Sequence, residues 1–290
     1  MKKTYKDAVV PRLLNTEFGF NPVYQRLAII GLMLIIIIMV ASFASNLITK
    51  IDPNLQGDLL NDRYLAPSWD HPFGTDKFGR DIFSRVLFGG RISLTIGISV
   101  VFFSVTIGIF YGAISGFFGG YFESVLMRIL DFLLAFPTIF LIITIVAIFN
   151  PGTWYLIPLL GLTSWMETAR LVRAEVLSIK TQDYILAAKG LGIGNFRVLF
   201  RHIIPNCLTP VFVAMPFMVG SIILLESALS FLGLGVQPPI PSWGNIIHDG
   251  SDVMMEAWWV TVFPGLCIVI TVMSFNFITE GLRVLLAPKN

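Results

Sequence analysis

Long uncharged apolar runs constrain this chain more than any other feature. Residues Leu27–Ile48 form a run of 22 residues without a charge, and residues 92–122 form another of 31. A bilayer core about 30 Å thick is crossed by roughly 20 apolar residues in a helix. Charged residues make up only 13% of the 290 residues, whereas a soluble domain has roughly 25%. We therefore expect an all-α polytopic membrane protein.

Prolines and glycines divide the apolar sequence into six predicted transmembrane helices. The first is expected at residues 27–49, as an uncleaved anchor, because it is longer than the apolar part of a secretory signal and lacks a convincing small-residue cleavage site. The other five fall within residues 92–282, at about 92–114, 127–149, 154–169, 203–225 and 257–279. The fifth extends to residue 232 if Glu226 is tolerated in the membrane. A turn at residues 150–152 separates the third from the fourth.

The distribution of basic residues orients the six spans. Fourteen of the 20 Lys and Arg residues lie on the side that holds the N-terminal tail, residues 1–26, and the C-terminal tail, residues 283–290. The remaining six lie in the loop 50–91, together with six Asp residues. The positive-inside rule therefore predicts that both termini are cytoplasmic and that the loop 50–91 is extracytoplasmic. The net charge of +2 gives no reason to expect a nucleic-acid partner.

The segment 176–205, between the fourth and fifth spans, has a helical pattern although it is predicted to lie outside the membrane. Thr181 is expected to cap a short helix, Asp183 to lie in its first turn, and Gly190 and Gly192 to end it. Four residues recur at helical spacing along that helix: Tyr184, Ala187, Ala188 and Leu191. A second short helix carries Arg201 on its polar side and is expected to break at Pro205.

Two interpretations of the first short helix remain open at this point. The helix could lie in the lipid headgroup layer, as many amphipathic helices do. Its two alanines favour the other interpretation, docking of another protein, because small side chains allow a second surface to approach closely.

The sequence of this segment resembles a known motif. Residues 183–206, DYILAAKGLGIGNFRVLFRHIIPN, are similar to the EAA loop of the permease subunits of bacterial ABC importers. Ala187 and Ala188 match its alanines, Gly192 its glycine and Pro205 its final proline, whereas Leu186 stands in place of its glutamate. Residues 71–94 and 228–244 resemble segments of the C-type permeases of dipeptide, oligopeptide and nickel transporters, and residues 278–289 resemble their ending.

This resemblance implies the type I ABC importer permease fold and a pore-forming subunit that imports peptides by alternating access. It also implies four kinds of partner: a second permease in a heterodimer, two ABC ATPases, an extracytoplasmic peptide-binding protein, and the peptide itself. The chain contains no G-x-x-x-x-G-K-[ST] motif, so we expect no cofactor and no enzymatic activity in this chain, with ATP and Mg bound by the ATPases. The helix from Tyr184 to Leu191, preceded by Asp183, would be the coupling helix that docks on them. Ala188→Asp would uncouple ATP hydrolysis from uptake while leaving the protein inserted.

Two further groups of residues are candidates for a site. Arg80, Asp81 and Arg85 fall on a predicted amphipathic helix at the outer membrane surface, where they either form an i,i+4 ion pair or contact a binding protein. Glu226 is the one acid predicted inside a span, with Pro210 and Pro216 nearby. It could line the pore, form hydrogen bonds within the bundle, or contact the partner permease. Histidines and cysteines are scattered, so we expect no metal site.

Several other functions remain as alternatives. The same family resemblance fits a permease for nickel or another small solute. An ion-coupled secondary transporter is less favoured, because such proteins usually carry several intramembrane acids and an inverted repeat. An integral-membrane enzyme would need a catalytic constellation, and none is visible in the sequence. The expected location is the bacterial cytoplasmic membrane.

Overall fold

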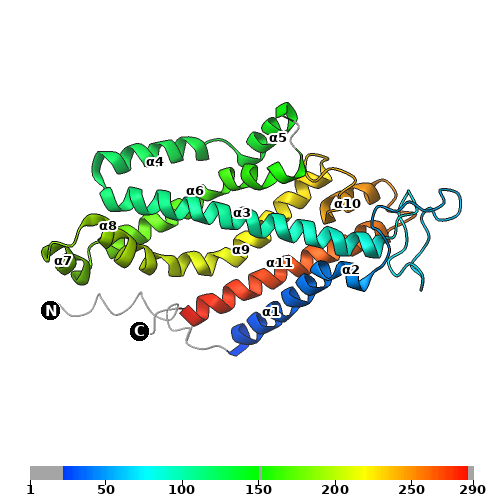
Figure 1. The fold of residues 1–290 in the computed structure, drawn as a ribbon, viewed down its shortest axis with the longest axis horizontal. Helices are drawn as coiled ribbons and strands as arrows, with labels where there is room; N and C mark the ends of the chain where they lie inside the picture. The colour runs from blue at the N-terminus through cyan, green and yellow to red at the C-terminus, as the bar shows by residue number, and fades with distance from the viewer. Residues whose placement is uncertain (1–21, 150–151, 287–290) are drawn as a thin grey trace, which may run out of the picture.

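The computed structural model describes residues 22–149 and 152–286, and apart from one isolated bridge between Thr75 and Asp81 their regular structure is helical. The elements are α1 (Pro22–Phe43), α2 (Ser45–Ile48), α3 (Ile82–Phe118), α4 (Gly120–Leu134), α5 (Thr138–Phe149), η1 (Thr153–Tyr155), α6 (Leu156–Ile179), α7 (Asp183–Gly190), α8 (Asn195–Val198), the π-helical turn η2 (Leu199–Ile203), α9 (Ile204–Phe231), α10 (Trp243–Ser251) and α11 (Trp259–Leu286). The long helices α1, α3, α6, α9 and α11 form an elongated bundle (Figure 1).

Four helical segments are long and apolar enough to cross a membrane: Val23–Phe43, Ile82–Phe118, Asn195–Phe231 and Trp259–Leu286. Helices α4 and α5 qualify only as a pair, bent by 73°, so the described residues contain four or five candidate spans rather than a confirmed six. The prediction of one continuous helix over 127–149 is wrong. The break includes Pro137, which lacks an N–H donor and disfavours a helical conformation at Phe136.

Helix α3 corrects two boundaries that the sequence pattern predicted. At 37 residues it is about 55 Å long, well beyond the thickness of the apolar bilayer core. The predicted surface helix before residue 91 does not exist separately, because α3 already begins at Ile82, where Asp81 caps it by accepting a hydrogen bond from the Ser84 N–H at 2.7 Å. The predicted stop before Gly116 is also wrong, since the helix continues to Phe118.

Small residues explain why α3 and α6 can pack along so much of their length. Gly108, Gly112 and Gly116 recur at every fourth position of α3, so they lie on one helix face. A Cβ at Gly108 would lie 2.6 Å from the Thr168 Cβ, and one at Gly116 would lie 3.1 Å from the Val176 Cβ. Close backbone approach through small residues is a common way for membrane helices to associate.

Helices α1 and α11 also pack through small residues. Gly31 of α1 and Gly281 of α11 both lie at the contact, where a Cβ at Gly31 would lie 2.6 Å from the Ser274 carbonyl oxygen. Helix α1 begins five residues earlier than predicted and ends at Phe43, and α11 continues to Leu286, into the predicted C-terminal tail. Most of the predicted N-terminal tail, the end of the C-terminal tail and most of the turn at 150–152 lie outside the described residues.

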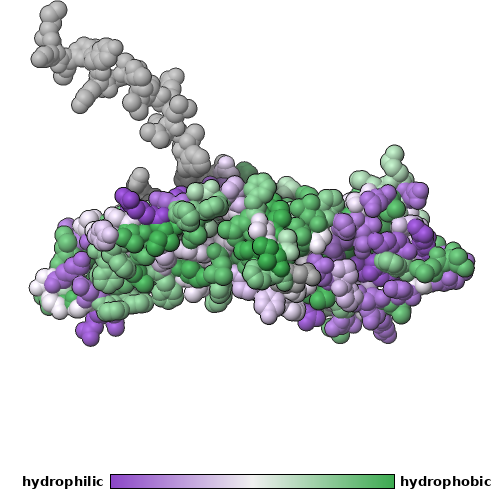
Figure 2. Space-filling view, turned by 90° about the horizontal axis from the view of Figure 1, so that it is seen from above, coloured by the Kyte–Doolittle hydropathy of each residue, from purple (hydrophilic) through white to green (hydrophobic). Residues whose placement is uncertain are grey.

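The two ends of the bundle differ in character. One end holds α10 and the segment 49–81, and is called here the α10 end; the other holds α7 and α8 and is called the α7 end (Figure 1). Figure 2 shows hydrophobic surface over the middle of the molecule and a concentration of hydrophilic surface at the α10 end. Large exposed side chains on the lateral surface include Ile37, which is 63% exposed, and Phe102, which is 71% exposed. Such a surface is suited to contact with lipid.

Candidate functional site

Helix α7 confirms that the predicted short helix exists, although its cap differs from the prediction. Gln182 is the N-cap residue and its side chain does not cap the helix. Thr181 is not the cap, because its hydroxyl donates a hydrogen bond to the Ser178 carbonyl at 2.9 Å. Asp183 lies in the first turn and Lys189 in the last. Both charges therefore interact favourably with the helix dipole.

The two sides of α7 have different environments. Ile185 and Ala188 are buried, whereas Ala187 is exposed. The Lys189 ammonium lies 5.1 Å from the centroid of the Phe117 ring, a cation–π contact that connects α7 to the last turn of α3. The two alanines therefore differ in role, and Ala188→Asp would disturb packing within this chain rather than test docking alone.

Several large apolar residues in and around α7 and α8 are exposed. Four of them are called here the α7 patch: Tyr184, Leu186, Leu191 and Phe196. Leu191 is 83% exposed and Phe196 is 74% exposed. Exposed apolar groups of this size gathered at one place commonly mark a protein or membrane contact.

Only one of the two glycines predicted to end α7 has a backbone that requires glycine. Gly192 has φ +76°, and its N–H donates to the Lys189 carbonyl at 3.0 Å. The next N–H, of Ile193, donates to the Ala188 carbonyl at 3.2 Å. Gly190 is the last residue of α7, with open space around the position of a Cβ. Gly192 therefore sets the turn, since other L-residues rarely adopt its conformation.

The connection from α8 to α9 does not break at Pro205, contrary to the prediction. Residues Asn195–Phe231 form one helical run, which passes through the π-helical turn η2 before Pro205. Pro205 comes directly after the π turn, and the helix continues past it although proline lacks the N–H that an interior position normally donates. Arg201 is exposed within the π turn. The helix that begins at Asn195 is thus continuous with α9.

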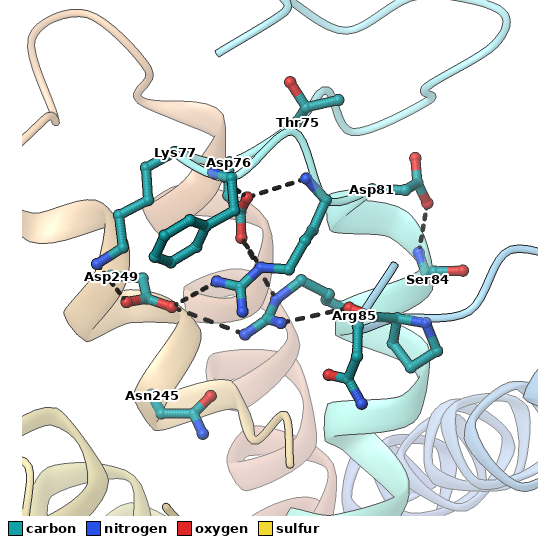
Figure 3. Close-up of polar contacts among 12 residues, drawn as sticks. Thr75, Asp76, Lys77, Asp81, Ser84, Arg85, Asn245 and Asp249 are labelled. Atoms are coloured by element: carbon teal, nitrogen blue, oxygen red, sulfur yellow. Dashed lines mark hydrogen bonds and ion pairs between the residues drawn. The ribbon is translucent and has the colours of Figure 1, made fainter. Parts of the chain in front are cut away.

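An ion-pair network lies at the α10 end. The Asp76 carboxylate pairs with the Arg80 Nε at 2.6 Å, and Asp249 of α10 pairs with Arg80 at 3.1 Å and with Lys77 at 2.9 Å. Arg85 of α3 lies 3.7 Å from both carboxylates and donates a hydrogen bond to the Pro53 carbonyl at 3.3 Å. Figure 3 shows Asp249 between Lys77 and Arg85. The network joins the segment before α3 to α3 and to α10.

The structure gives the three predicted outer residues internal partners. Asp81 pairs with the His71 Nδ1 at 2.9 Å and caps α3, so the predicted Asp81–Arg85 ion pair does not form. The side chains of Arg80, Asp81 and Arg85 are all buried. A buried ion pair needs good geometry to offset the loss of hydration. Contact of this region with a binding protein stays a prediction.

Glu226 of α9 is fully buried, and serine hydroxyls surround its carboxylate. Ser93 of α3 donates to it at 2.9 Å and Ser230 at 2.7 Å. The Ser230 hydroxyl in turn accepts a hydrogen bond from the Val236 N–H at 2.9 Å. In this conformation Glu226 forms hydrogen bonds within the bundle, which was one of the three alternatives.

The two prolines predicted near the pore come before Glu226 in α9. Pro210 lines a groove of about 780 Å³ between α6, α9 and α11. Pro216 is half-buried. Among the described residues, no group of three or more His, Cys, Asp or Glu side chains is placed to hold a metal ion.

Comparison with known proteins assigns this chain to a family. A model of the binding-protein-dependent transport system inner membrane component matches residues 104–290. The chain belongs to this family of membrane permeases. It is 39% identical over 270 residues to the dipeptide transport system permease protein DppC of Alkalihalophilus pseudofirmus, covering 91% of this chain and 86% of the relative.

Two oligopeptide transport system permease proteins, both named OppC, are also similar to this permease. The protein of Bacillus subtilis is 39% identical over 265 residues, which cover 91% of this chain and 86% of the relative. The protein of Haemophilus influenzae is 43% identical over 227 residues, which cover 78% of this chain and 73% of the relative. The predicted resemblance to the peptide permeases of ABC transporters is therefore confirmed, and the permease is a multi-pass membrane protein.

The sequence analysis did not identify Asp249 as a partner of Arg80 or Ser93 as a partner of Glu226. Asp249 lies 169 positions from Arg80, and Glu226 lies 133 positions from Ser93. The single charges of Asp76 and Asp249 resemble ordinary loop or helix-end residues in the sequence. Only the fold brings them to the same place.

Proposed function

We propose that this chain is a pore-forming permease subunit of an ATP-driven ABC importer that moves peptides into the cytoplasm. The observation that carries the proposal is the similarity, over about nine-tenths of the chain, to relatives named as dipeptide and oligopeptide permeases. A second permease, two ATPases and an extracytoplasmic binding protein would complete the transporter, with ATP and Mg bound by the ATPases.

The α7 end would face the cytoplasm together with both termini. Basic residues concentrate there: six lie between residues 170 and 201, which agrees with the positive-inside rule. The α7 patch would dock in a groove of an ATPase subunit, with Tyr184, Ala187 and Leu191 in contact and Asp183 at the start of the helix. The buried pair Ile185 and Ala188 would hold the helix against its own permease.

Alternating access would follow from the two attachments of α7. The Lys189–Phe117 contact connects it to α3, and the turn at Gly192 connects it to the helical run that continues as α9. A displacement of α7 by the ATPases would therefore move two spans together, as in other rigid-body transitions. The binding protein would deliver peptide at the α10 end.

Reconstitution of the complete transporter tests this function. The permease, its partner permease and both ATPases would be placed in vesicles, and a labelled peptide would be supplied on the binding protein. We expect peptide uptake that requires ATP and stops when the ATPases carry an inactivating substitution. Uptake driven by an ion gradient without ATP would instead indicate a secondary transporter. ATP-driven uptake of nickel but not of peptide would indicate a nickel permease, the alternative that the family resemblance also fits.

A further inference from the structure

Helix α6 carries an acidic residue, Glu167, near the inner end of the predicted span 154–169. Glu167 lies midway between Leu156 and Ile179, the two ends of α6. Its neighbour Thr168 packs against Gly108 of α3, and Gly108 lies within the uncharged sequence that runs from residue 92 to 122. Glu167 is nevertheless exposed on the surface of this chain.

The two arginines that follow Glu167 on α6 have acidic partners. Arg170 forms an ion pair with Asp131 at 2.5 Å, and the Arg173 Nε donates to Glu123 at 2.6 Å, both acids lying on α4. Within residues 22–149 and 152–286, no ion pair or hydrogen bond involves the Glu167 side chain. The α4 acids therefore neutralise both arginines and leave the Glu167 charge uncompensated.

An uncompensated carboxylate inside the predicted span 154–169 is not suited to contact with lipid. Intramembrane acids are costly against hydrocarbon and generally face the protein interior, a partner or a water-filled path. Glu167 lies in a cavity of about 200 Å³ between the α4–α5 bend, α6 and α9. Hydroxyl groups line the same cavity, from Thr138, Thr163, Ser164 and Ser221.

The size and lining of the cavity define the ligand that it fits. A volume of about 200 Å³ is smaller than a typical pocket for a whole small molecule, roughly 300–1,000 Å³, so it can hold one end of a peptide. A carboxylate attracts a cation, and hydroxyls can donate to or accept from amide groups. Phe217 and Met218 add an apolar wall for a side chain.

We propose that Glu167 binds the α-ammonium group of a peptide during translocation, while the surrounding hydroxyls bind its first amide groups. The inference rests on the proposed function and adds to it a substrate contact in the cavity of this permease. Because each peptide with a free amino terminus presents this group, the site recognises a peptide without reading its side chains. A charge-assisted contact of this kind also releases the peptide once the cavity opens to water, where both charges are hydrated.

Uptake by the assembled transporter tests the role of the charge. We expect Glu167→Gln to lower the rate of ATP-driven tri-alanine uptake by about tenfold, the effect of losing one charge-assisted hydrogen bond, and Glu167→Asp to retain most of the rate. Glu175→Gln is the matched control, since Glu175 is another acid of α6 and does not line this cavity. An unchanged rate in Glu167→Gln, or an equal loss in the control, would overturn the proposal.

A labelling experiment tests recognition of the amine without the binding protein. Ser164→Cys would be introduced into an assembled transporter in which Cys207→Ala and Cys267→Ala remove the two native thiols of this chain. We expect tri-alanine to slow labelling of this cysteine by a charged methanethiosulfonate, and N-acetyl-tri-alanine to have no effect. Equal protection by both peptides, or protection that persists with Glu167→Gln, would contradict binding of the ammonium group.

These outcomes separate the site from the proposed function. If the wild-type transporter imports no peptide, the proposed function fails, and the labelling experiment still reports whether the cavity binds the amine. If the wild type imports tri-alanine and Glu167→Gln does so equally well, the function stands and the site is wrong. A smaller amount of assembled transporter with Glu167→Gln would assign Glu167 to a subunit contact and would also overturn the proposal.

Discussion

The left-handed turn at Gly192 gives the sharpest test of how α7 is held. Gly192→Ala adds a Cβ to a residue with φ +76°, whereas Gly190→Ala adds one at the end of a right-handed helix. No atom lies within 4 Å of the added Cβ at either position. The two substitutions therefore differ in backbone strain and not in steric contact.

The expected cost follows from the backbone alone. A left-handed conformation costs an L-residue about 1–2 kcal/mol, and the reduced freedom of alanine in the unfolded segment offsets roughly 0.4–1 kcal/mol of this. The net change of about 1 kcal/mol alters the population of the ordered turn about fivefold. Gly190→Ala is expected to have no adverse effect, since alanine is favoured over glycine in a helix.

Hydrogen exchange and transport measure the two consequences. In the assembled transporter, we expect Gly192→Ala to lower the protection of the backbone amides of residues 183–193 about fivefold, because the turn donates hydrogen bonds from Gly192 and Ile193. The number of peptides imported per ATP hydrolysed should fall with it. Gly192→Asn should recover much of both values, as asparagine tolerates the left-handed region better than alanine.

Two results would refute this reasoning. Equal exchange and equal transport for Gly192→Ala and Gly190→Ala would show that backbone strain at Gly192 does not control α7. A similar loss in Gly192→Asn and Gly192→Ala would attribute the effect to the added side chain and not to the φ angle.

Three other predictions concern packing, charge and docking. Asp249→Ala should lower the stability of the folded permease by roughly 3 kcal/mol, because it leaves buried arginines without one of their two carboxylates; an unchanged thermal unfolding midpoint would contradict this. Gly281→Ala should destabilise the contact of α1 with α11 by about 1–3 kcal/mol, whereas Gly265→Ala on the same helix should not, since no atom lies within 4 Å of its added Cβ. Ala188→Asp should lower the amount of folded permease, while Ala187→Asp should leave that amount unchanged and lower uptake, as measured in the same vesicles.

The sequence predicted those helices that are marked by a pattern of neighbouring residues. Apolar runs located α1, α3, α9 and α11, and the spacing of apolar residues located α7. Their boundaries were less accurate where packing extends a helix, as at Gly116, which reads as a helix end but lies against Val176 of α6. A glycine that permits close packing and a glycine that ends a helix cannot be distinguished before the neighbouring helix is known.

The polar clusters could not be predicted because their partners are distant in sequence. Asp81 and Arg85 have the spacing of a local ion pair, yet each finds a better partner elsewhere, in His71 and in the carboxylates of Asp76 and Asp249. Ala187 and Ala188 look equivalent in the sequence, and only the direction of α7 relative to α3 makes one buried and the other exposed. Local periodicity identifies a helix but not which neighbour its faces meet.

The residues of the network at the α10 end are far apart in the sequence, so the ribosome synthesises them at different times. Arg80 is synthesised 169 residues before Asp249, an interval of roughly 10–30 s at common rates of chain elongation. During that interval the early half of the network carries two arginines and only one of its two carboxylates, at the very start of α3. A chain that stops before α10 would keep that excess positive charge without the Asp249 carboxylate that the complete chain supplies.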